Sequence, residues 1–101
     1  MMYLTADQQI TRENLMYRLN EMLREYSVTT YKYDKYHTTW QTEKTFEQYW
    51  TKMNLLEDAI DNLYSILTNR FELTDREKSR FNRVYTIAIN RRFAVTDTLR
   101  G

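Results

Sequence analysis

The chain of 101 residues contains no cysteine and no proline, and its only glycine is residue 101. The absence of cysteine excludes a disulfide scaffold, zinc or iron–sulfur sites with cysteine ligands, and a thiol nucleophile. Proline and glycine are the residues that most often end helices, so a chain without them lets helices run long. The composition therefore favours a helical domain over a small disulfide-rich or zinc-bound one.

Motifs that support catalysis are also missing. Phosphate-binding loops need glycines so that backbone amides can approach the ligand, and none is available. The single histidine, His37, has no nucleophile or metal motif around it. Two acidic pairs, Glu21 with Glu25 and Glu57 with Asp61, lack the histidine that a two-metal bundle site requires, so we interpret them as solvated helix faces. We expect no enzymatic activity, no cofactor and no metal site.

Long apolar runs are absent as well, since no stretch approaches the 18 residues of a membrane span. The first residues turn polar too early for a signal peptide. Hydrophobic residues make up 42% of the chain and the net charge is +1, which is compatible with one folded domain and a small core. We expect a single soluble, cytoplasmic domain over residues 1–101.

Three segments show helical patterns, over about residues 6–26, 43–71 and 75–93. In the first, Thr5 and Gln8 form a capping pair ahead of an apolar stripe, and in the third a capping box begins at Thr74 and ends at Glu77. The second has the strongest pattern, an unbroken heptad spacing that comprises Phe46, Tyr49, Met53, Leu56, Ile60, Leu63 and Leu67.

The length of the second segment predicts the shape of the domain. At about 1.5 Å per residue it spans roughly 44 Å, well beyond the size of a round domain of this length. The sequence therefore predicts an all-α fold, an elongated three-helix antiparallel bundle. Its heptad seam is interpreted as intramolecular core, with a homodimer through helix 43–71 as the alternative.

The stretch between the first two helices, residues 27–41, is dense in threonine and tyrosine. Both residues favour extended backbone, and no helical stripe is obvious in residues 30–34. We expect a long connection there, with a short hairpin centred on Asp34 and Lys35 as an alternative. Residues 94–101 are expected to form a tail.

The aromatic residues of this connection are the first candidate binding site. The candidates for contact with a partner are Tyr31, Tyr33, Tyr36 and Trp40. Tyrosine offers a large contact area at low entropic cost, which favours protein recognition. The neighbouring Lys32 and Lys35 leave single-stranded nucleic acid as an alternative, with bases stacked on the rings.

Charge is unevenly distributed, and this indicates a second candidate site. Residues 1–69 hold 7 basic and 10 acidic side chains, whereas residues 70–101 hold 8 and 4. On a helical wheel one stripe of the third helix comprises Arg76, Arg80, Arg83, Ile87 and Arg91. An isoleucine among arginines is typical of a protein interface. The alternative is internal pairing with acidic residues of the second helix, namely Glu47, Glu57, Asp58 and Asp61.

These features predict a non-catalytic module that binds a larger protein stoichiometrically, as an inhibitor or adaptor. In general character the chain resembles small orphan proteins of bacterial viruses, many of which bind and block a host enzyme or defence complex. Two alternatives belong to other classes: a nucleic-acid-binding accessory protein, and a self-assembling structural component. A membrane partner is not expected.

Overall fold

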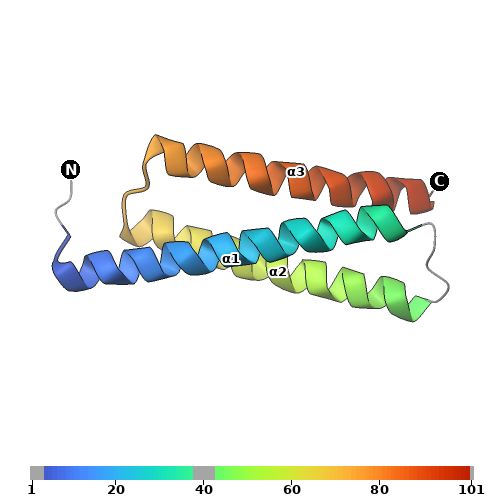
Figure 1. The fold of residues 1–101 in the computed structure, drawn as a ribbon, viewed down its shortest axis with the longest axis horizontal. Coiled ribbons are helices and arrows are strands. Elements are labelled where there is room, and N and C mark those ends of the chain that lie inside the picture. The colour runs from blue at the N-terminus through green and yellow to red at the C-terminus, as the bar shows by residue number, and fades with distance from the viewer. Residues whose placement is uncertain (1–3, 38–42, 101) are drawn as a thin grey trace.

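The computed structural model describes residues 4–37 and 43–100, which form three helices and contain no strand. These are α1 (Ala6–Tyr36), α2 (Glu43–Arg70) and α3 (Asp75–Arg100) (Figure 1). The molecule measures 53 × 22 × 17 Å and has a radius of gyration of 16.3 Å, above the value of about 13 Å for a compact domain of this length. The predicted elongated, all-α three-helix bundle is confirmed.

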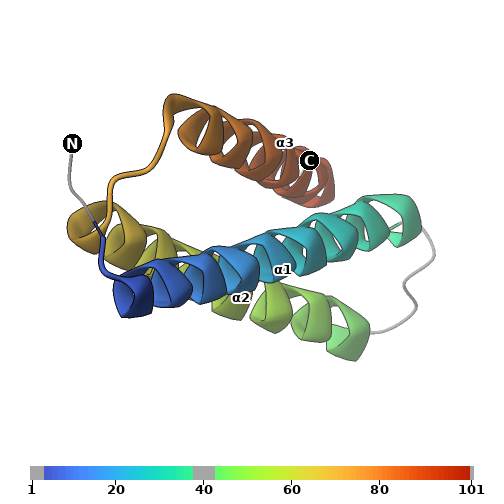
Figure 2. The same cartoon turned by 60° about the vertical axis from the view of Figure 1, so that its left-hand side comes forward.

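Helix α1 is the central element of the bundle. It packs closely against both α2 and α3, running parallel to α3 and antiparallel to α2 (Figure 1). In the described residues no Cα atom of α2 lies within 8 Å of one in α3, and Figure 2 shows α3 standing apart from α2. Helices α2 and α3 are antiparallel, and they meet through long side chains that reach across the space between them.

The heptad seam of α2 lies inside the chain. Four of its residues are buried in the core, namely Met53, Ile60, Leu63 and Leu67, and the other three pack against that core. A homodimer through this seam would require the bundle to open. Of the neighbouring apolar residues of α2, Leu55 and Ile66 remain exposed.

The expected connection over residues 27–41 and its hairpin are wrong as far as residue 36, because α1 continues to Tyr36. Tyr26, Thr30 and Tyr33 prolong the buried stripe of the helix at spacings of 4 and 3. The buried Thr29 and Thr30 hydroxyls donate to the carbonyls of Glu25 (2.7 Å) and Ser27 (3.0 Å). Burial against two helices therefore outweighs the extended preference of threonine and tyrosine.

The expected tail over residues 94–101 is also wrong, since α3 continues to Arg100. Val95 is buried in the core, and the Thr96 hydroxyl lies 3.3 Å from that of Tyr33 on α1. This last part of α3 packs on the part of α1 that was expected to be a connection. The two errors are related, because these two segments pack against each other and the sequence of one does not show the other.

Both predicted helix starts have their caps. The Thr5 hydroxyl accepts from the Gln8 amide, and the Gln8 side chain accepts from the Thr5 amide. Thr74 and Glu77 make the same reciprocal pair, at 2.9 and 3.1 Å, at the start of α3. These caps satisfy amides that the first turn of a helix leaves without a partner.

Candidate functional site

One arginine of α3 lies inside the bundle and joins α3 to α2. Only 5% of Arg92 is exposed. Its guanidinium donates to the Glu57 carboxylate at 2.5 Å and to the Asn54 side chain at 2.6 Å, and it lies 4.4 Å from the centroid of the Trp50 ring. A buried cation needs such partners, because its desolvation is costly.

Tyr26 brings α1 into the same network. Its hydroxyl donates to the other oxygen of Glu57. Burial, this hydrogen bond and the charge of Glu57 raise the pKa of Tyr26 well above its usual range. Asp61, one turn further along α2, accepts a hydrogen bond from Tyr85 at 2.9 Å. The expectation of a solvated pair is therefore wrong for Glu57, which is half-buried and bonded to Tyr26 and Arg92, whereas Asp61 is exposed.

Two more arginines fasten α1 to α3. Arg12 contacts the Glu77 carboxylate at 2.5 Å and the Glu72 carbonyl at 3.3 Å. Burial raises the pKa of Glu77, but hydrogen bonds from Thr74 and Arg12 outweigh it and hold that pKa below its usual value. At the other end, Arg91 donates to the Ser27 carbonyl at 3.2 Å. Arg91 therefore belongs partly to the fold.

The remaining arginines of the predicted stripe have a different environment. Arg76, Arg80 and Arg83 are exposed, and none has an ion-pair or hydrogen-bond partner among the residues that the structure describes. The internal pairing considered for the stripe is therefore not found for these three. Ile87, which follows them, is 53% exposed.

The structure describes three of the four predicted aromatic contact residues, and it places them in different environments. Tyr33 is completely buried between Phe46 and Tyr49, with ring centroids 6.4 and 6.1 Å away, so its prediction as a contact residue is wrong. Trp40 lies outside the described residues. Tyr31 and Tyr36 are exposed, and the Lys35 ammonium lies 5.9 and 5.4 Å from their ring centroids.

The two predicted sites meet on one side of the molecule. The Arg91 guanidinium lies 5.7 Å from the centroid of the Tyr31 ring, which links α3 to the outer side of α1. Nearer the helix starts, Tyr17 and Arg80 line one groove between the same two helices. We define the α1–α3 face by these residues: Tyr17, Tyr31, Arg76, Arg80, Arg83, Ile87 and Arg91.

Sequence reasoning missed Tyr17, which is 69% exposed and has the largest exposed fraction among the big apolar side chains of the described residues. It lies fourteen residues, or two heptads, before Tyr31, so the two tyrosines fall on the same side of α1. That spacing is visible in the sequence. What the sequence does not show is that this side of α1 is left uncovered.

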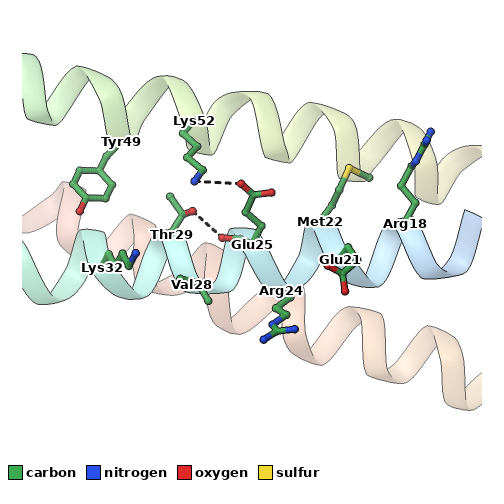
Figure 3. A pocket seen from close by; sticks show the side chains of 10 residues that line it. All are labelled: Arg18, Glu21, Met22, Arg24, Glu25, Val28, Thr29, Lys32, Tyr49 and Lys52. Carbon is green, nitrogen blue, oxygen red and sulfur yellow. Dashed lines mark hydrogen bonds and ion pairs between the residues drawn. The ribbon is translucent and has the colours of Figure 1, made fainter.

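Two hollows flank α1. The one towards α2, of about 530 Å³, is lined mainly by charged side chains, and in it Lys52 reaches across to Glu25 at 3.2 Å (Figure 3). The one towards α3, of about 400 Å³, has an apolar floor made of Leu19, Leu23, Leu73 and Phe81. The second has the more apolar lining, and Arg80 at its edge has no ion-pair partner among the described residues.

The described residues contain no group of three or more His, Asp or Glu side chains that could hold a metal ion. His37 caps the end of α1 and donates from Nδ1 to the Asp34 carbonyl at 2.5 Å. None of the three helices, over their described residues, has a stretch long and apolar enough to cross a bilayer.

Comparison of the chain with protein-family models, with curated protein sequences and with solved structures finds no match. No family assigns a role. The functional argument rests on the residues of the α1–α3 face.

Proposed function

We propose that this protein is a non-catalytic module that binds a larger protein stoichiometrically, as an inhibitor or adaptor, through the α1–α3 face. One observation carries the proposal. Ile87 is half exposed next to a row of arginines, and Arg76, Arg80 and Arg83 have no acidic partner among the described residues. Arginine and large apolar side chains together are what the centres of protein interfaces contain.

These outer arginines make no ion pair that stabilises the fold among the described residues. Arg76, Arg80 and Arg83 follow each other at spacings of four and three, so their charges are neighbours on the helix surface and repel. Such pairs cost a few tenths of a kcal/mol each in isolated helices, about the same as a favourable pair contributes. A surface that costs stability without an internal gain is expected where a partner supplies the missing charge.

A protein partner suits this surface better than a nucleic acid. Phosphates would pair with the arginines but would leave Ile87 without a contact, and the sequence pI of about 7.9 is modest for a nucleic-acid-binding domain. Tyr31 beside Arg91 supplies a second anchor of the kind that protein interfaces favour.

The test is affinity capture by tagged protein from candidate host lysate, with and without nuclease, read by mass spectrometry and by absorbance at 260 nm. The variant Arg80→Glu with Arg83→Glu reverses two charges of the face. The matched control, Arg18→Glu with Lys32→Glu, makes the same charge change in the hollow of Figure 3.

We expect one stoichiometric protein that survives nuclease, is lost with the Arg80/Arg83 variant and is kept by the control. Equal capture by both variants would overturn the proposed face. Recovery of nucleic acid alone, or of proteins that disappear with nuclease, would instead support the nucleic-acid-binding alternative.

A further inference from the structure

The groove between α1 and α3 is the part of the α1–α3 face that is lined by residues of all three helices. Its floor comes from α1 (Leu19 and Leu23), from α3 (Phe81) and from the loop before α3 (Leu73), and Tyr64 of α2 also lines it. Met16 and Tyr17 form the wall on α1. An apolar side chain placed in this groove would contact three helices at once.

The floor of the groove is held in place before any ligand binds. The rings of Phe81 and Tyr64 stack with centroids 3.8 Å apart and planes 7° apart, and Tyr85 packs against Phe81 at 5.3 Å. The Arg12–Glu77 ion pair closes one end, since both residues also line the groove. A preformed site avoids the cost of ordering these groups on binding.

Arg80 connects the groove to the basic row. It lines the apolar groove, and it also lines a neighbouring hollow together with Arg76, Ser79 and Arg83. An occupant of the groove therefore lies beside Arg80, while Arg76 and Arg83 line the next hollow, and none of the three has an acidic partner in the described residues. The complementary ligand has apolar groups on one side and carboxylates next to them.

We propose that this groove accepts an acidic amphipathic helix of the partner protein, with its apolar side chains on the floor and its carboxylates against Arg76, Arg80 and Arg83. This inference rests on the proposed function and specifies the partner's binding element. The lining of α1 extends from Arg12 to Leu23, which at about 1.5 Å per residue is roughly 16 Å, or three helical turns. Helices that bind grooves present anchors at positions i, i+3 or i+4, and i+7, which span about 10.5 Å and so fit within this length.

Glu13 gives the groove a direction. It lines the α1 side, where its carboxylate accepts a hydrogen bond from the Gln9 side chain at 3.2 Å, while Arg80 lines the α3 side. A bound helix is therefore expected to turn its acidic flank to α3. A carboxylate on the flank next to Glu13 would be repelled, which limits the helix to one rotational setting.

The probe is a synthetic amphipathic peptide of about four helical turns with leucine anchors and glutamates along one flank of the apolar stripe. A second peptide has glutamines in place of the glutamates, and a single-stranded oligonucleotide of equal charge represents a phosphate ligand. Each is titrated into the ¹⁵N-labelled full chain, and the amide signals of Tyr17, Leu73 and Phe81 are followed.

The acidic peptide is expected to shift these three amides with a Kd at least about tenfold lower than that of the glutamine peptide. Arg80→Glu with Arg83→Glu should remove that difference, and the control Arg18→Glu with Lys32→Glu should keep it. Phe81→Leu alters the floor without altering charge, and it should weaken both peptides.

Three outcomes would overturn the inference: equal binding of the two peptides, shifts confined to residues outside the groove, or stronger binding of the oligonucleotide with the same shifts. If one of these occurs while capture of a partner still depends on Arg80 and Arg83, the acidic helix is wrong and the proposed function remains. If that capture is also insensitive to the two arginines, the proposed function fails with it.

Discussion

Helix α3 carries arginines of two kinds: one lies inside the bundle and joins the helices, and the others are exposed on the outer side. On the inner side Arg92 is 5% exposed and joins three helices through Glu57, Asn54 and the Tyr26–Glu57 hydrogen bond. On the outer side Arg76 and Arg83 are exposed and have no partner among the described residues. The same residue type thus specifies the packing of the helices on one side and is left available for contact on the other.

Arg91 lies at the boundary between the two groups. It holds the Ser27 carbonyl of α1, and it also stands against the exposed ring of Tyr31. The residue type alone therefore does not show whether an arginine on a helix stabilises the fold or is available to a partner. Its role depends on whether a second helix covers it, and the following predictions test that difference.

The largest effect is expected at the inner arginine. Arg92→Met removes the cation and leaves the Glu57 carboxylate half-buried without its ion-pair partner. Breaking a buried pair in this way costs about 3 to 5 kcal/mol, so urea unfolding should show a loss in that range.

The double variant Arg92→Met with Glu57→Gln is the control for this prediction. Its neutral amide can still accept the Tyr26 hydrogen bond, so part of the lost stability should return. A cost below about 1 kcal/mol for the single variant would show that the network does not hold the helices together.

A smaller effect is expected at the Arg12–Glu77 ion pair, which joins α1 to α3 and which we call the clamp. Glu77→Gln loses the ion pair to Arg12 and weakens the cap at Thr74, at a cost of about 1 to 2 kcal/mol at pH 7. The folded-state pKa of Glu77 is lowered, so its contribution is present above the unfolded-state pKa of about 4.3 and is lost as the pH falls through the folded-state value.

Unfolding curves of the wild type and of Glu77→Gln, recorded from pH 7 down to about pH 3, measure this dependence. The difference in unfolding free energy should shrink as the pH falls. A difference that stays constant over this range would show that the charge of Glu77 does not stabilise the fold.

The smallest effect is expected at the outer arginines. The triple variant Arg76→Gln, Arg80→Gln and Arg83→Gln should change the free energy of unfolding by no more than about 0.5 kcal/mol, because these groups have no internal partner. A slight gain would follow from the loss of mutual repulsion. A loss above about 1 kcal/mol would place these residues with Arg92 as part of the fold.

The helical class, the extent of α2 and both capping boxes could be predicted from the sequence, because they depend on local spacing and local hydrogen bonds. The continuation of α1 over residues 27–36 was missed, because threonine and tyrosine favour extended backbone and the sequence does not show that α2 and α3 cover them. Its signal was nevertheless present: Tyr26, Thr30 and Tyr33 keep the spacing of the preceding leucines.

The candidate site was predicted in part, for a similar reason. The residues at positions 81, 85, 88, 92 and 95 follow one core stripe, so Arg92 occupies a core position. An arginine at such a position can be predicted to be buried only if its acidic partner is known. Here the partner is Glu57, which belongs to another helix. Tyr33 was misplaced because the segment was expected to be a connection.

The most direct test of the account compares the affinity of the captured partner, purified, for the wild type and for the Arg76/Arg80/Arg83 triple glutamine variant by isothermal titration calorimetry. The account predicts a loss of at least about tenfold in affinity, while the free energy of unfolding stays within about 0.5 kcal/mol of the wild-type value. Equal affinity of the folded variant would contradict it, since the outer arginines would then serve neither the fold nor a partner.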